Sequence, residues 1–265
     1  NDPILIKHGH DHWWLSIADT DVLLWAKGLA TGFGFDVKVH EPNIWPLAVQ
    51  GPNAEELCVR VFGEEICNIG FFRGEWKKFD GRSIYIARSG WSKQGGFEIY
   101  LNDFTMGEKL WDVFFEKGKD LDVGAGCPNL IERIESGLIS FGADATYETT
   151  PFECGLEQYV NLEADIQSLS INALRKQKPK TRLVGLVVNE KIDLADRLVI
   201  DEKEVIGEIT ANTWSPRYSV YLAYARCNVK RLEVLKELSV KSTTGLVQAK
   251  ITDLPFNFSA LELGS

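Results

Sequence analysis

The sequence contains no long apolar run, a single methionine and fewer basic than acidic residues. Its apolar runs fall far short of the roughly eighteen residues that a membrane-spanning helix needs, and no signal segment opens the chain. We therefore expect a cytoplasmic protein with no membrane partner. The formal net charge of -9 argues against nucleic acid as a partner, because affinity for phosphate depends on clustered Lys and Arg.

Cysteine is also scarce. The five cysteines, at positions 58, 67, 127, 154 and 227, are odd in number and widely spaced. This spacing predicts neither a disulfide framework nor a zinc ribbon, so reduced thiols are the simplest interpretation. Cys127 and Cys154 have no neighbouring His in sequence that would mark a nucleophile. We expect both to be small buried residues.

The dinucleotide-binding fingerprint is missing too. Residues 123–128 (VGAGCP) place glycines before an expected helix, where they could cradle an anion, but the third glycine of the fingerprint is absent. A tight loop that packs under the helix is the favoured interpretation. His8, His10 and His12 alternate and could share a strand face as metal ligands, yet no Cys or carboxylate cluster completes the site. A polar loop is favoured there, and no metal is predicted.

Apolar periodicity indicates strands and helices that alternate in the first part of the chain, opening with a βα unit. Strands are predicted at 13–18, 35–39, 47–49, 84–89 and 97–101, and helices at 20–30, 54–62, 105–119 and 128–141. In the third helix, Leu110, Val113 and Phe114 share a face that would cover a sheet. Trp13, Trp25, Trp45 and Trp111 lie in similar apolar patterns and are expected in the core.

From Arg182 onward the pattern changes to short strands, predicted at 183–188, 205–211, 220–225 and 246–251. At 265 residues with 45% hydrophobic residues, the chain is long enough for two or more lobes. The fold class is therefore α+β, with an α+β region at 1–176 and a β-rich domain at 181–265. A solvated basic linker around Pro179 divides them.

A glycine-rich hairpin between the strands at 84–89 and 97–101 is the most informative segment. Because strand side chains alternate, Glu98 and Tyr100 project from one face and Phe97 and Ile99 from the other. The glycine pair before Phe97 allows close approach of a ligand to the backbone. An ordinary hairpin with a solvated polar face is the alternative.

Five segments in chain order carry a resemblance to a known family. Residues 89–100 (SGWSKQGGFEIY) resemble the SGYTGExGYE signature of the glycine-cleavage T-protein (aminomethyltransferase) family. Residues 133–137 (RIESG) are similar to its RLEAG, and residues 151–156 (PFECGL) to its PLEAGL. Residues 207–216 and 1–4 resemble further family motifs. The resemblance implies a T-protein-like fold, with mixed sheets and helices and a C-terminal β-barrel-like domain.

Within the family, the residues of these motifs resemble those found in the branch of dimethylsulfoniopropionate (DMSP) demethylases. That branch implies a tetrahydrofolate-dependent methyltransferase, which moves a methyl group from a small-molecule sulfonium to N5 of tetrahydrofolate. A T-protein, which releases ammonia from an aminomethylated lipoyl carrier, is one alternative. A folate-binding scaffold that catalyses nothing is another. The cysteine motif of the family's iron-sulfur-assembly members is absent from residues 90–96.

The resemblance also implies site residues. Glu98 would accept hydrogen bonds from the pterin edge, because a carboxylate can accept two from adjacent N–H donors. The implied catalytic residues are Asn1 and Asp2, and the implied cofactor-binding residues are Glu98, Tyr100, Trp91, Ser89, Arg133 and Trp214. Asn1 stands where a T-protein has an acid, which weakens the case for ammonia-releasing chemistry.

The N-terminal part of the family pattern has no counterpart before Asn1. On this pattern we expect the chain alone to be a poor catalyst, because an open pocket aligns its substrates badly and admits water. We also expect apolar surface to be exposed, and association of the chain, for which a homodimer is the simplest form.

Overall fold

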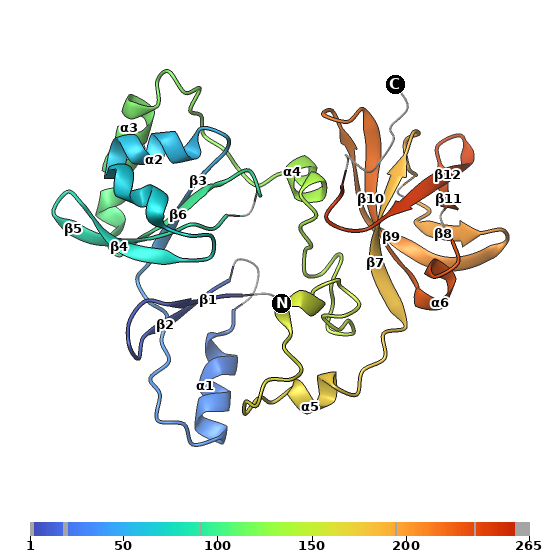
Figure 1. The fold of residues 1–265 in the computed structure, drawn as a ribbon, viewed down its shortest axis with the longest axis horizontal. Coiled ribbons are helices and arrows are strands. Elements are labelled where there is room, and N and C mark those ends of the chain that lie inside the picture. Colours follow the sequence, from blue (N-terminus) through green and yellow to red (C-terminus); the bar gives the residue numbers. More distant parts are fainter. Residues whose placement is uncertain (1–2, 18–20, 91, 194, 236, 258–265) are drawn as a thin grey trace. The chain divides into compact units, whose positions relative to one another are not determined.

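The computed structural model describes residues 3–257, apart from 18–20, 91, 194 and 236. Contacts between residues divide the chain into two compact units, residues 2–128 and residues 129–265 with Asn1. Figure 1 shows a small mixed unit and a β-rich unit. The division into domains at 1–176 and 181–265 stays a prediction.

A four-stranded antiparallel sheet forms the middle of the N-terminal unit, in the order β3-β6-β5-β4. Its strands are β3 (Trp45–Gln50), β4 (Gly74–Phe79), β5 (Arg82–Ala87) and β6 (Gly96–Leu101). The helical segments are α1 (Leu23–Gly32), α2 (Ala54–Phe62), η1 (Glu64–Asn68), η2 (Phe104–Met106) and α3 (Gly107–Lys117). The bounds of α2 are those predicted from the sequence.

The helices α2 and α3 cover one face of this sheet. Phe97 and Ile99 of β6 are fully buried against them, as their alternation predicted. On α3, Leu110 and Phe114 lie four residues apart and are buried in the same cluster, so the helix meets the sheet along one apolar stripe.

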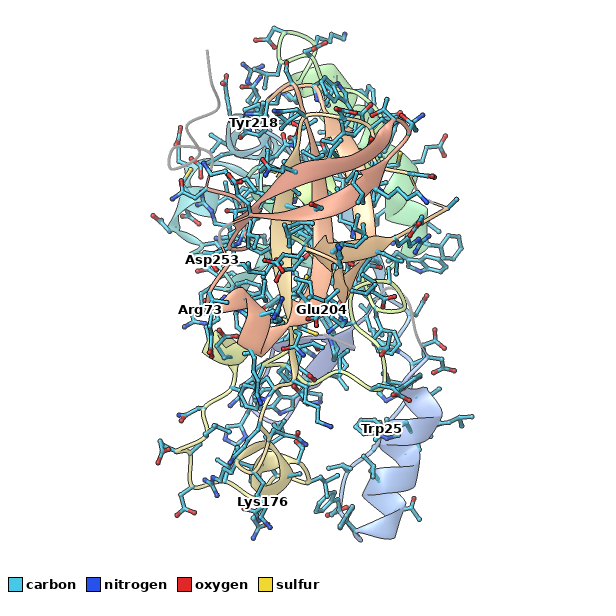
Figure 2. The ribbon with its side chains drawn as sticks, turned by 90° about the vertical axis from the view of Figure 1, so that its right-hand side faces the viewer. Trp25, Arg73, Lys176, Glu204, Tyr218 and Asp253 are labelled. Atoms are coloured by element: carbon cyan, nitrogen blue, oxygen red, sulfur yellow. The ribbon has the colours of Figure 1, made fainter. Side chains whose placement is uncertain are left out.

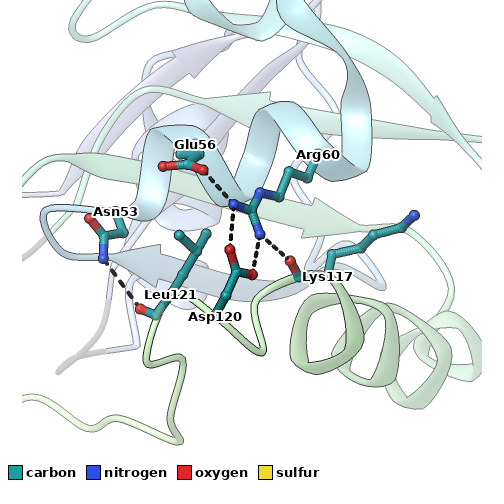
Figure 3. Close-up of polar contacts among 6 residues, drawn as sticks. All are labelled: Asn53, Glu56, Arg60, Lys117, Asp120 and Leu121. Carbon is teal, nitrogen blue, oxygen red and sulfur yellow. Dashed lines mark hydrogen bonds and ion pairs between the residues drawn. The ribbon is translucent and has the colours of Figure 1, made fainter.

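Arg60 of α2 holds this layer together at its rim (Figure 3). Its guanidinium pairs with both oxygens of Asp120, with Glu56 one turn earlier, and with the carbonyl oxygen of Lys117 at 2.8 Å. These contacts tie α2 to the chain that follows α3. Because they are solvent-exposed, they specify the arrangement more than they stabilise it.

The opposite face of the sheet is covered by an antiparallel hairpin of β1 (Ile4–Lys7) and β2 (Trp13–Ser16). Ile6 and Trp14 of the hairpin pack on Tyr85, Ala87 and Tyr100 of the sheet. The strand predicted at 13–18 and the helix predicted at 20–30 form as β2 and α1, although the strand β1, which was not predicted, precedes them. The strand predicted at 35–39 does not form.

The tryptophans expected in the core are exposed instead. Trp13, Trp25, Trp45 and Trp111 are between 41% and 64% exposed, and Trp25 is labelled on α1 in Figure 2. The reason is clearest on β2, where Trp14 faces the sheet and the alternation of side chains turns Trp13 outward. The residue types showed which segments are apolar, but not which side of each strand or helix is covered by the rest of the protein.

The C-terminal unit contains a closed six-stranded antiparallel barrel, in the order β10-β7-β12-β11-β8-β9. Its strands are β7 (Thr181–Val188), β8 (Leu198–Asp201), β9 (Glu204–Ser215), β10 (Val220–Asn228), β11 (Glu237–Ser242) and β12 (Gly245–Thr252). Aliphatic side chains fill the interior, among them Leu186, Val199, Ile209 and Val240. Sequence periodicity predicted four of these strands and missed β8 and β11.

Short helices accompany the barrel: α4 (Leu130–Glu135), η3 (Glu157–Tyr159), α5 (Ile171–Leu174) and α6 (Val229–Leu232). Helix α4 packs on the outside of the barrel through the fully buried Ile134. It is much shorter than the helix predicted at 128–141, because Gly137 adopts a φ of +73° and ends it. The basic residues 175–180 are exposed, as predicted for a linker.

All five cysteines are free thiols. Cys154 is buried as expected, but Cys127 is exposed, and so are the glycines of the loop before it. The loop therefore does not pack under α4 as predicted. None of the helices in the described residues is long and apolar enough to cross a membrane.

Candidate functional site

Glu98 lies on the sheet face that is opposite to the helices, in a row of very small side chains. Its neighbours in register are Ala48 on β3 and Ala87 on β5, and Ala87 is in turn paired with Gly74 on β4. Cross-strand neighbours share a face of the sheet. Glu98 is therefore the one residue with a polar side chain in a row that crosses all four strands, and the other three residues of this row are alanine or glycine.

This row was not predicted as part of the site. Ala48 lies in the strand predicted at 47–49, and Ala87 in the strand before the glycine-rich turn. Neither residue carries a polar group that would mark it in the sequence. The signal that would find them is strand register, because it alone shows which residues flank Glu98.

Ser89 is buried and its hydroxyl donates a hydrogen bond to Oε2 of Glu98. This hydrogen bond engages one of the two carboxylate oxygens. A carboxylate offers about four acceptor positions, so Glu98 can accept more from a ligand. The structure thus brings together two of the residues that the family resemblance implied.

Tyr100 is next to them, two residues after Glu98 on the same face. Burial and the nearby charge of Glu98 raise the pKa of its phenol to about 12. Its ring is 3% exposed and lies 5.8 Å from the ring of Trp14. The phenol is therefore neutral and covered by the β1–β2 hairpin, and the polar side chains of Ser16 and Glu98 interact with its hydroxyl.

Beyond Tyr100 the same face carries a group of packed rings, which we call the aromatic cluster. Its members are His8, Trp14, Trp76, Tyr85 and Tyr100. His8 stacks on Trp14 with 3.9 Å between ring centroids, and the indole N–H of Trp76 donates to the carbonyl oxygen of His8 at 3.1 Å. Burial and the neighbouring His12 lower the pKa of His8. We found no group of three metal-ligating side chains in the described residues.

The loop that joins β5 to β6 is fixed by Gln50, the last residue of β3. Its amide Nε2 donates to the carbonyl oxygens of Ser89 at 3.1 Å and Phe97 at 3.3 Å, and its Oε1 accepts from the hydroxyl of Ser92 at 3.1 Å. A Cβ atom at Gly90 would lie 1.9 Å from that Oε1. A side chain at position 90 would therefore displace the Gln50 amide from these hydrogen bonds.

Arg133 and Trp214 lie in the C-terminal unit. Arg133 of α4 forms an ion pair with the fully buried Asp144 and lies 5.7 Å from the ring of Tyr224. Burial lowers the pKa of Arg133. Its side chain therefore braces α4 against the barrel. Trp214 of β9 is half exposed and packs at 5.0 Å against Tyr221.

The motif at 151–156 has a structural role of its own. Both oxygens of Glu153 accept hydrogen bonds, Oε2 from the backbone and hydroxyl of Thr150 and Oε1 from Lys180 and Thr181 at the start of β7. Although desolvation opposes it, this set of donors lowers the pKa of Glu153. Glu153 thus fastens the preceding loop to the barrel. Three predicted site residues, Asn1, Asp2 and Trp91, lie outside the described residues.

The residues around Glu98 fit the pterin part of a folate. A pterin is flat and has adjacent N–H donors on one edge, which a carboxylate accepts as a pair. Ala48, its neighbour on β3, is exposed and small, so no large side chain stands at that position beside the Glu98 carboxylate, whereas Ala87 on the other side is covered by the β1–β2 hairpin. A flat ring can therefore approach the carboxylate edge-on.

Two domain families cover most of the sequence. Residues 1–164 match the GCVT N-terminal domain, and residues 181–257 match the glycine cleavage T-protein C-terminal barrel domain. The chain belongs to the glycine cleavage T-protein (GCVT) family. The resemblance seen in its motifs is confirmed, and the closed barrel is the domain that the second match describes.

Relatives in this family carry two different names. The chain is 45% identical over 227 residues to the dimethylsulfoniopropionate demethylase DmdA of Ruegeria pomeroyi, covering 84% of this chain and 62% of the relative. It is 32% identical over 216 residues to an aminomethyltransferase of Listeria monocytogenes, covering 79% and 59%. The crystal structure of the aminomethyltransferase T from Bartonella henselae superposes with a TM-score of 0.69 at 23% identity, over 88% of this chain and 64% of that one. The fold prediction is thereby confirmed, and the chain spans about three fifths of the length of these relatives.

Proposed function

We propose that this chain is part of a tetrahydrofolate-dependent methyltransferase, which takes its methyl group from a small sulfonium such as DMSP. The observation that carries the proposal is the Glu98 carboxylate, fixed by Ser89 and flanked by Ala48 and Ala87. The 45% identity to a DMSP demethylase supports the choice of donor. Five free thiols fit a reducing, cytoplasmic location.

Each residue of the site has a physical task in this proposal. Glu98 binds the amino-pyrimidinone edge of the pterin and sets its rotation, because two parallel hydrogen bonds fix a direction as well as a distance. Ser89 holds the carboxylate in one orientation through its hydroxyl. The small, exposed side chain of Ala48 lets the ring lie close to the sheet at β3.

Little acid–base catalysis is required of the protein. Tetrahydrofolate, when bound, supplies the N5 nucleophile that accepts the sulfonium methyl, which gives 5-methyltetrahydrofolate and a thioether acid. The protein contributes by holding both substrates in line and by excluding water. Aromatic faces attract a sulfonium for the same electrostatic reason that they attract an ammonium, and the aromatic cluster supplies such faces beside Tyr100.

Aminomethyl transfer is the second candidate, since relatives named aminomethyltransferase also align with most of the chain. Their identity of 29% and 32% is lower than the 45% shared with the demethylase. Asn1 also lacks the carboxylate that a T-protein has at this position, and an amide cannot serve as a general base. These two observations favour methyl transfer.

Parallel incubations distinguish the candidates. The protein is mixed with tetrahydrofolate and either DMSP or an aminomethylated lipoyl carrier, and the folate products are separated by chromatography. We expect 5-methyltetrahydrofolate and a thioether acid from DMSP, and no ammonia from the carrier. Ammonia together with methylenetetrahydrofolate, without any methylated folate, would reverse the order of the two candidates. Binding of tetrahydrofolate with no turnover of either donor would instead indicate a scaffold.

A further inference from the structure

Gln50, the last residue of β3, is half-buried at the end of the sheet that carries the candidate site, yet the sequence motifs give it no role. It is paired with Gly96 in the β3–β6 ladder, two residues beyond the pair of Ala48 and Glu98. Because side chains alternate along a strand, Gln50 projects from the same sheet face as Glu98. Its amide therefore lies at the end of the sheet where the loop from Ser89 to Gly96 begins.

The amide of Gln50 fixes this loop at three points. Nε2 binds the carbonyl oxygen of Ser89 before the loop and that of Phe97 after it, at 3.1 and 3.3 Å. Oε1 accepts from the hydroxyl of Ser92 within the loop, at 3.1 Å. A single side chain thus sets the separation of the two loop ends and the position of its middle.

The backbone of the loop is built around this side chain. Gly90 has no room for a Cβ atom beside the Gln50 amide, and a Cβ at Gly96 would lie 2.1 Å from the carbonyl oxygen of Val49. Gly96 also has a φ of +126°, a backbone conformation that favours glycine. The loop is therefore closely fitted to the end of β3.

We infer that Gln50 is a positioning residue for folate binding, acting through Ser89 on the carboxylate of Glu98. The inference rests on the proposed function. Ser89 contacts both residues: its carbonyl oxygen accepts a hydrogen bond from Gln50, and its hydroxyl donates one to Glu98. Releasing the carbonyl lets the hydroxyl move, and the carboxylate then loses the partner that orients it.

The test is a titration with tetrahydrofolate in a calorimeter, using Gln50→Met, Ser89→Ala and the double variant. Methionine matches glutamine in length but makes none of its hydrogen bonds, so we expect Gln50→Met to weaken binding about tenfold. Because both changes act on one link, the double variant is expected to bind no more weakly than Gln50→Met alone. Gln248→Met, at an exposed position of β12, is the matched control and should bind normally.

Three outcomes overturn the inference. Binding by Gln50→Met equal to that of the unchanged protein would show that the amide does not matter. Effects of Gln50→Met and Ser89→Ala that multiply would show that they act independently, as a merely structural role of Gln50 would predict. No binding to the unchanged protein would overturn the proposed function itself, and the inference with it.

A milder variant applies if Gln50→Met does not fold. Ser92→Ala removes the loop hydroxyl that binds Oε1 and leaves the other contacts of Gln50 in place. We expect it to fold with a nearly unchanged melting temperature and to bind tetrahydrofolate a few times more weakly. Unchanged affinity in a folded Ser92→Ala protein would also contradict the inference.

Discussion

The carboxylate of Glu98 is the group on which the proposed site depends. Replacing it by the amide of glutamine keeps the shape but removes the charge and one of the two acceptors. We expect Glu98→Gln to weaken tetrahydrofolate binding by about 1 to 3 kcal/mol, roughly ten- to a hundredfold. Calorimetric titration measures this directly, with Glu108→Gln on α3 as a control for the loss of one charge. Equal affinity of the folded Glu98→Gln variant would remove Glu98 from the site.

The sequence was sufficient to predict Glu98 and its face, because strict alternation in residues 97–101 leaves only one arrangement of the side chains. It could not predict the setting of that residue. Ala48 and Ala87 flank it through pairing with β3 and β5, and Gln50 lies two residues beyond Ala48 on the same face. Pairing partners far apart in the chain are not encoded in local periodicity.

Tryptophan shows the same limit at the scale of a single side chain. Trp14 is packed into the aromatic cluster while its neighbour Trp13 is half exposed. The two residues are identical in type and adjacent in the sequence. Only the placement of the hairpin on the sheet decides which of them is buried.

At the scale of elements, the contact between α4 and the barrel depends on Asp144. This fully buried carboxylate pairs with Arg133, accepts from the backbone of Ser140 at 2.9 Å and accepts from the hydroxyl of Thr210 at 2.5 Å. Asp144→Asn would leave the Arg133 charge buried without a counter-charge. We expect a loss of about 3 to 5 kcal/mol in the free energy of unfolding of this unit, measured by denaturant titration.

The matched control for Asp144 is Asp196→Asn, which breaks the more exposed pair with Lys241. That change should cost much less than Asp144→Asn, because solvent screens the exposed pair. Equal costs for the two variants would show that the buried ion pair does not hold α4 on the barrel. Removing both charges with Arg133→Met and Asp144→Leu should cost less than Asp144→Asn alone.

The hydrogen bonds that Glu153 accepts from Thr150 and from the start of β7 make the stability of this unit depend on pH. Its pKa in the folded state is lowered from the ordinary value of 4.5, so the unfolded chain binds its proton more readily. Its stabilising effect is complete above that ordinary value and is lost as the pH falls through the folded-state pKa. At neutral pH we expect Glu153→Gln to cost about 1 kcal/mol.

Melting temperatures of Glu153→Gln and of the unchanged protein check this from pH 7 down to acid. We expect their difference to shrink as the pH falls, because the native carboxylate also becomes neutral. The exposed Glu157 is the control, and Glu157→Gln should show no difference at any pH. A difference for Glu153→Gln that stays constant into acid would show that its charge is irrelevant to the contact.

Elements with a strong pattern of their own were predictable, and short ones were not. Residues 54–62 formed a helix with the predicted bounds. Strand β4 was missed because its sequence, GEWKKF, has little apolar alternation and lies at the edge of the sheet. Helix α4 was predicted too long because apolar periodicity continues past Gly137, whose positive φ ends the helix.

At the scale of the whole molecule, the family motifs predicted more of the fold than apolar periodicity did. Motifs from residue 89 to residue 216 indicated the T-protein family before any element was known, and two domain matches confirm it. Periodicity indicated strands after Arg182 but could not show that they close into a barrel, because closure depends on the pairing of β9 with β10 and of β10 with β7.

The central claim is that this chain binds tetrahydrofolate at Glu98 and that N5 of this folate receives the methyl group of a sulfonium. The most direct test uses DMSP carrying carbon-13 in its S-methyl groups, tetrahydrofolate and the protein, followed by nuclear magnetic resonance. We predict that the label appears on N5 of the folate in step with an equal amount of labelled thioether acid, and that Glu98→Gln slows this transfer. Label that stays entirely in DMSP while the same protein releases ammonia from an aminomethylated lipoyl carrier would contradict the account.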